Sequence, residues 1–186
     1  MAFTSVPQLV SSSLNQVWVP RFYEQTHRYS FDEVEIRNAF FYNCQSIVIG
    51  FIGALSLFAL PYLLRAIGGN LLAYVSMQRE ICLMLLGYIT LSPWSHSYNY
   101  LLAYDKGPHI MRVVVGTSVI GILVWFLLML ALGPIGIYIG FFVQMFLRSV
   151  GIFFYSRQFW PLRFGWTGLV VGSALVLLPL FVANLY

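Results

Sequence analysis

Residues 113–132 read VVVGTSVIGILVWFLLMLAL, and this stretch decides the class of fold. It carries no charged side chain, and its few polar groups belong to Thr117, Ser118 and the indole of Trp125. An α-helix needs about 20 mainly apolar residues to cross the roughly 30 Å hydrocarbon core of a bilayer. The stretch therefore predicts a membrane-spanning helix.

Further apolar segments lie on both sides of this one, at about 2–20, 38–64, 72–103, 135–155 and 166–185. The longest of them, 72–103, contains Pro93, which interrupts the helical pattern. The segment 2–20 is the most polar. Helices of these lengths account for most of the chain and leave no separate soluble domain. We therefore expect an all-α, polytopic bundle of about six membrane-spanning segments, forming a single transmembrane domain over residues 1–186.

The composition agrees with this class, because 60% of the 186 residues are hydrophobic and only 9% are charged. About a quarter of the residues of an ordinary soluble domain are charged. The aromatic content of 18% excludes a disordered chain. The net charge of +4 comes without a run of basic residues, so we expect no nucleic acid as a partner. Cys44 and Cys82 lie in apolar segments and are interpreted as small hydrophobic residues.

The connections between the segments predict an orientation. If the segments alternate across the membrane, the loops 21–37, 104–112 and 156–165 share one side. Cytoplasmic loops gather lysine and arginine. We therefore expect these three loops to be cytoplasmic and the chain to be a multi-pass protein of the cell inner (cytoplasmic) membrane. The loops carry seven of the ten basic residues: Arg21, Arg28, Arg37, Lys106, Arg112, Arg157 and Arg163.

The opposite loops, 65–71 and 133–134, carry only Arg65. In this orientation both termini lie outside, and the first segment enters the membrane almost at Met1. That segment is also too polar to insert well alone. We therefore expect the chain to be the C-terminal portion of a larger transporter.

Polar and small residues recur along one face of the fifth segment, at positions 136, 140, 144, 148, 151 and 155. This spacing marks one side of a helix. Two interpretations remain open: the face packs against another helix, or it lines a hydrated cavity. Similar groups occur in the other segments: Asn43, Ser46, Gly50 and Gly53; Ser92, Ser95, His96 and Asn99; Gly165, Gly168 and Gly172.

Three charged residues lie inside the predicted spans. Placing the charged side chain of Arg148 inside the membrane costs at least about 2.5 kcal/mol on insertion scales. An anionic ligand, snorkelling or pairing with Glu80 would offset this cost. Glu80 is a candidate ion-coupling acid, with an interfacial pair with Arg79 as the alternative. His96 is either a hydrogen-bonded core histidine or a proton relay.

Motifs for catalysis and cofactor binding are missing. The chain has no GxxxxGK[ST], HExxH, paired CxxC or GxSxG pattern. His27, His96 and His109 are too scattered for a metal site. We therefore expect no catalytic residues, no metal and no cofactor, and a protein that is not an enzyme.

Three stretches carry a resemblance to a known family: SSSLNQVWVPRFY at 11–23, LSPWSHSYNYLLAYDKGPHIMR at 91–112 and LALGPIGIYIG at 130–140. They are similar to helix ends and tight turns of polysaccharide flippases. Over residues 1–158 the chain resembles the C-terminal lobe of an O-antigen or polysaccharide flippase of the multidrug/oligosaccharidyl-lipid/polysaccharide exporter superfamily. The segment 166–185 is an additional span.

This resemblance implies a two-lobed bundle that flips a polyprenyl-diphosphate-linked oligosaccharide by alternating access. Its partners would be the lipid bilayer, the lipid-linked oligosaccharide, and a missing N-terminal lobe or partner subunit. Arg148 and Arg79 would attract the diphosphate. The sugar path would be lined by Gln144, Asn43, Ser46, Ser95, His96 and Asn99.

Other functions remain open. A multidrug antiporter lobe of the same superfamily would move organic cations and would use acidic cavity residues. A non-transporting membrane assembly subunit would need Arg148 for complex formation only. A membrane-embedded glycan-modifying enzyme would need Glu80 as a catalytic acid or base.

Overall fold

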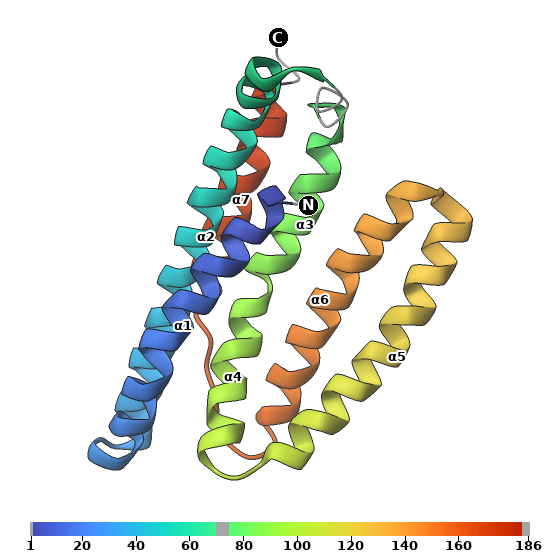
Figure 1. The fold of residues 1–186 in the computed structure, drawn as a ribbon. Coiled ribbons are helices and arrows are strands. Elements are labelled where there is room, and N and C mark those ends of the chain that lie inside the picture. The colour runs from blue at the N-terminus through green and yellow to red at the C-terminus, as the bar shows by residue number, and fades with distance from the viewer. Residues whose placement is uncertain (1, 70–74, 184–186) are drawn as a thin grey trace.

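The computed structural model describes residues 2–69 and 75–183. This part of the chain contains helices and no strand, as the sequence predicts. The helices, labelled in Figure 1, are α1 (Ala2–Arg28), α2 (Phe31–Ile67), α3 (Gln78–Ile89), α4 (Leu91–Ala103), α5 (Gly107–Leu132), α6 (Pro134–Ser156) and α7 (Thr167–Ala183).

Three of the described helices, α2, α5 and α6, are long and apolar enough to cross a membrane. The apolar helix α7 is shorter, α3 and α4 are separate short helices, and α1 does not reach the required hydropathy. The fold is therefore a helical bundle with the hallmarks of a membrane protein. The six-span count stays a prediction.

Residues 28–37, for which the sequence allows either a solvated loop or a short interfacial helix entering the second span, start α2 at Phe31, while α1 continues to Arg28. The reason is a capping box that starts α2. The side chain of Ser30 accepts a hydrogen bond from the backbone N–H of Glu33, and the Ser30 N–H donates to Glu33 Oε2 at 3.3 Å. Such a box satisfies two N–H groups that a helix start would otherwise leave unpaired.

The helices form a core bundle and a projecting hairpin (Figure 1). In the core, α7 lies along α2. The short helices α3 and α4 follow one another nearly in line, and α1 crosses in front of them. The α5–α6 hairpin leans away from this core. As a result, α5 exposes large hydrophobic residues such as Ile122, Phe126 and Leu130, a surface suited to lipid.

Glycines bring α2 and α7 into close contact. A Cβ atom at Gly50 would lie 2.4 Å from the backbone oxygen of Gly172, and one at Gly172 would lie 2.4 Å from the backbone oxygen of Ser46. The glycines of 165–172 thus form the close-packing face expected for helix contacts in membranes. Beside this contact, a hydrophobic cluster that includes Leu57, Leu85 and Val176 joins α2, α3 and α7.

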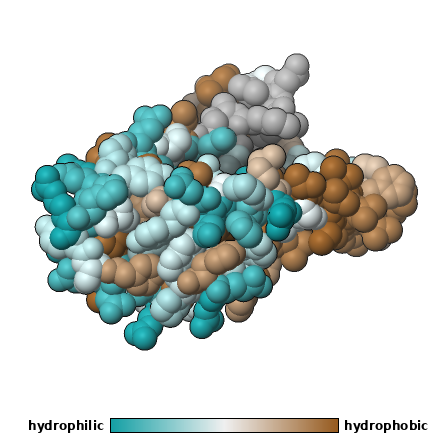
Figure 2. All heavy atoms as spheres, turned by 90° about the horizontal axis from the view of Figure 1, so that it is seen from below, coloured by the Kyte–Doolittle hydropathy of each residue, from teal (hydrophilic) through white to brown (hydrophobic). Residues whose placement is uncertain are grey.

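The three basic connections lie at one end of the molecule. The α1–α2 turn, the α4–α5 turn and the α6–α7 connection are together at the bottom of Figure 1, while the α5–α6 turn is at the top. Figure 2 looks onto the basic end and shows mainly hydrophilic residues, with a hydrophobic projection to one side. The shared end is as predicted, and its cytoplasmic orientation stays a prediction.

Candidate functional site

Arg148 of α6 is an embedded charge that has no counterion within 4 Å among the described residues. Its guanidinium carbon lies 4.2 Å from the centre of the Trp94 ring of α4. Its Nε is buried and has no hydrogen-bond partner. Among the described residues, the ion pair within 4 Å joins Glu24 and Arg28, so Arg148 does not pair with Glu80. A cation over an indole is attracted by the ring, but its hydrogen-bond donors remain available.

Aromatic side chains of α4 extend this site. The Trp94 ring stacks on Tyr98, with 5.6 Å between ring centres. We call this group, Trp94, Tyr98 and Arg148, the Arg148 face.

The exposed residues of α1 are both polar and apolar. Ser11 lies at the depth of the α2 span, because its carbonyl and hydroxyl oxygens accept hydrogen bonds from Gln45 Nε2 at 3.2 and 2.9 Å. At this depth, lipid cannot satisfy exposed polar groups, so they need water, another protein surface or their own helix, as Ser12 has in the Leu9 carbonyl. The exposed polar residues are Gln8, Ser12, Ser13 and Gln16, and Val6, Leu9 and Val17 are exposed beside them.

The predicted site residue His96 lies inside the bundle and is fully buried. Trp18 Nε1 donates to Asn38 Oδ1 at 2.8 Å, so the Asn38 amide group faces His96 Nδ1 at 3.0 Å and donates to it. His96 is then a neutral histidine with its proton on Nε2. The network ties α1, α2 and α4 together, and His96 does not reach the Arg148 face.

Asn99 and Asn43 also make contacts between helices. Asn99 is buried and donates to the Tyr42 hydroxyl at 2.8 Å. Asn43 donates to the Ala39 carbonyl and accepts a hydrogen bond from the backbone N–H of Gly168 at 2.8 Å. Asn43 thereby satisfies an N–H in the first turn of α7, as a capping residue would.

Gln144 lies in the contact between α6 and α5. A Cβ atom at Gly121 of α5 would lie 2.7 Å from its side chain. The glycines of the same stripe also face α5, since Gly140 contacts Trp125 and Gly151 contacts Thr117. Of the two interpretations of this stripe, helix packing applies to these residues. Arg148 departs from it and reaches α4.

Arg79 and Glu80 lie in the first turn of α3, away from the Arg148 face. Arg79 is exposed, whereas Glu80 is half-buried and its Oε2 is buried without a hydrogen-bond partner. Arg79 precedes Trp94 by fifteen residues, or roughly 22 Å along a helix. The structure does not bring the two predicted phosphate-binding arginines together.

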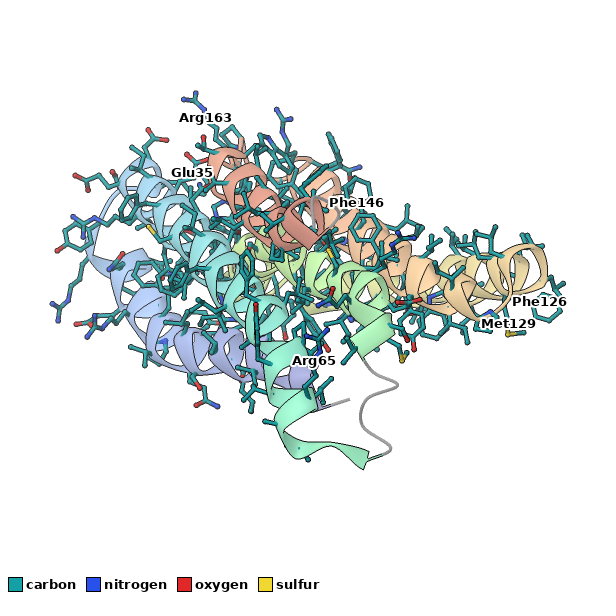
Figure 3. All side chains as sticks on the ribbon, turned by 90° about the horizontal axis from the view of Figure 1, so that it is seen from above. Glu35, Arg65, Phe126, Met129, Phe146 and Arg163 are labelled. Atoms are coloured by element: carbon teal, nitrogen blue, oxygen red, sulfur yellow. The ribbon has the colours of Figure 1, made fainter. Side chains whose placement is uncertain are left out.

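A cleft of about 450 Å³ lies at the basic end, also away from Arg148. Glu35 accepts a hydrogen bond from the backbone N–H of Arg163 beside it, and Figure 3 shows the two side by side. The sequence assigned no chemistry to this acidic segment. The lining residues are Asp32, Glu35, Ile36, Ala39, Asn43, Pro161, Arg163 and Gly165.

Glu35 precedes the apolar run 38–64, so it lies outside the spanning part of α2. Burial raises the pKa of its carboxyl above the ordinary value of 4.5, and the hydrogen bond from Arg163 offsets part of this rise. The cleft therefore holds a carboxyl group that is harder to ionise than one in water. No group of three or more potential metal ligands occurs in the described ranges.

Comparison with known proteins returned no match: no family model, no curated protein and no solved structure is similar to this chain.

Proposed function

We propose that this chain takes part in moving a polyprenyl-diphosphate-linked oligosaccharide across the cell inner membrane, as one lobe of a transporter. The observation that supports this most is Arg148, a guanidinium at membrane depth with a buried Nε that lacks a partner. A guanidinium binds phosphate oxygens through paired, charge-assisted hydrogen bonds. An anionic diphosphate would supply the missing counterion.

The exposed polar residues of α1 support the same proposal. Sugar hydroxyl groups need hydrogen-bonding walls, and exposed serine and glutamine side chains such as Ser12 and Gln16 provide them. The lipid tail would remain in the bilayer while the head group moves past these residues. These exposed residues also fit a cavity completed by an N-terminal lobe or a partner subunit.

The other predicted site residues have either a direct or an indirect role in this proposal. Arg79 would be a second phosphate contact near the other end of the path, and Glu80 an ion-coupling acid with an available oxygen. Gln144, His96, Asn99 and Asn43 would act through the helices that they hold in place.

Arg148→Ala, in the complete transporter, is the test. We expect surface glycan to fall by about tenfold or more, because a hydrogen bond to a charged group is worth about 1.5–3 kcal/mol. Protein abundance in the membrane should not change. Arg157→Ala is the control, since Arg157 is an exposed arginine just beyond α6. Unchanged glycan in Arg148→Ala would rule out Arg148 as a substrate contact.

An organic-cation antiporter is the second candidate, supported by the unpartnered Oε2 of Glu80. In that case Glu80→Gln would abolish drug resistance, and Arg148→Ala would leave it intact. If the chain is an assembly subunit, Arg148→Ala would instead abolish binding of its partner, and neither surface glycan nor drug resistance would change.

A further inference from the structure

The cleft at the basic end combines charges of both signs that do not pair with each other. It lies between the start of α2 and the connection from α6 to α7, and its charged lining residues are Asp32, Glu35 and Arg163. In the described part of the chain, none of these three side chains forms an ion pair within 4 Å. The contact between Glu35 and Arg163 uses the backbone N–H of Arg163 instead. The cleft therefore offers two carboxylates and a guanidinium to a ligand.

Glu35 is the carboxylate of this cleft that most needs a cation. It is 6% exposed, and burial raises the pKa of its carboxyl above the ordinary value. One of its oxygens accepts the Arg163 backbone N–H, but an uncharged N–H offsets only part of the cost of burying a charge. A cationic group with N–H donors, held between Asp32 and Glu35, would stabilise the ionised carboxylate.

An exposed apolar surface continues from the cleft into the predicted span. Ile36 lines the cleft, and the exposed residues Phe40 and Ile47 follow it on the same side of α2. Trp166 is exposed just before α7, and indole side chains are enriched where a membrane meets water. The cleft therefore lies where a lipid headgroup would lie, with an apolar surface beside it for acyl chains.

We propose that this cleft binds a phospholipid whose headgroup carries a primary ammonium group, as in phosphatidylethanolamine. The ammonium donates hydrogen bonds to Asp32 and Glu35, the phosphate accepts from Arg163, and the acyl chains lie along the exposed side of α2. The quaternary ammonium of phosphatidylcholine has no N–H to donate. The volume of about 450 Å³ is in the range of small-molecule sites. This inference holds whatever cargo passes Arg148.

Competition between two lipids tests the ammonium contact. The full chain in detergent receives an equimolar mixture of dioleoyl phosphatidylethanolamine and dioleoyl phosphatidylcholine, and native mass spectrometry resolves the first lipid adduct. We expect about tenfold or more phosphatidylethanolamine in this adduct, because hydrogen bonds to charged groups are strong. Asp32→Asn combined with Glu35→Gln should bring the ratio to about one. Both new amides can still accept hydrogen bonds, including the one from the Arg163 N–H.

Glu24→Gln combined with Asp105→Asn is the matched control. It also removes two exposed carboxylates, but neither residue lines the cleft, so the ratio should equal that of the unmodified chain. A ratio near one in the unmodified chain would overturn the proposal. The proposal would also be overturned if the variant with both cleft carboxylates replaced kept the preference for phosphatidylethanolamine.

Arg163→Ala tests the phosphate contact separately. Both lipids carry the phosphate, so the total amount of bound lipid should fall while the ratio stays high. Arg157→Ala is the control, because Arg157 is an exposed arginine of the same connection that does not line the cleft. Equal lipid binding by these two variants would contradict the phosphate contact. Phosphoethanolamine, which lacks acyl chains, should not bind at the same concentration; equal binding would assign the cleft to a soluble ligand and overturn the lipid site.

Discussion

At the scale of single residues, some buried polar groups hold helices together, and others remain available to bind a ligand. Asn38, Asn43 and Asn99 have their hydrogen bonds met by neighbouring helices. Arg148 does not, since an indole face offers attraction but no acceptor. This contrast separates Arg148 from Asn43 and Asn99, which the sequence grouped with it as candidate site residues.

Glu35 gives a prediction about pH. Its carboxyl has a raised pKa in the folded chain because it is buried. Its contribution to stability is therefore complete at a pH below the pKa that Glu35 has in the unfolded chain. This contribution is lost as the pH rises through the pKa that Glu35 has in the folded chain. We expect Glu35→Gln to reduce the fall in melting temperature between acidic and neutral pH, measured in detergent. Gln can still accept the Arg163 N–H through its amide oxygen.

Asp105→Asn is the control for this measurement, because Asp105 is an exposed carboxylate that does not line the cleft. If the melting temperature of Glu35→Gln changes with pH as it does in the unmodified chain, Glu35 does not cause the pH dependence.

At the scale of helices, long apolar runs were predictable and contacts between them were not. The sequence located α2, α5 and α6, because some twenty consecutive apolar residues leave few alternatives. It left open whether residues 28–37 form a loop or a helix, although Ser30 and Glu33 have the spacing of a capping box. It singled out Arg148 from its charge, but not Trp94 as its companion, since this contact depends on how α4 packs against α6.

The α2–α7 contact gives a prediction at this scale. Gly50→Ala places a Cβ within 2.8 Å of three backbone atoms of Gly172, and a backbone cannot rotate away as a side chain can. We expect a loss of about 1–3 kcal/mol in stability, seen as earlier thermal unfolding in detergent. Gly116→Ala in α5 is the control, because nothing lies within 4 Å of its Cβ position. Equal melting temperatures for the two variants would contradict this close contact.

At the scale of the whole molecule, the three basic connections lie at one end and the α5–α6 turn at the other (Figure 1). This arrangement predicts the result of cysteine labelling in intact cells. Arg28→Cys, Arg112→Cys and Arg157→Cys should all be protected from an impermeant reagent, and Leu132→Cys should react. Labelling at only some of the basic-end positions would refute a common cytoplasmic side.

Only Tyr29 and Ser30 separate α1 from α2. Such a short turn keeps the adjoining helix ends together. A movement of α1 away from the bundle is therefore a rotation about the α1–α2 turn at the basic end. Displacement then grows with distance from the pivot, and Gln8 sweeps a wider arc than Gln16. Any opening along α1 is therefore wedge-shaped, narrow beside Tyr23 and widest toward the far end of the helix.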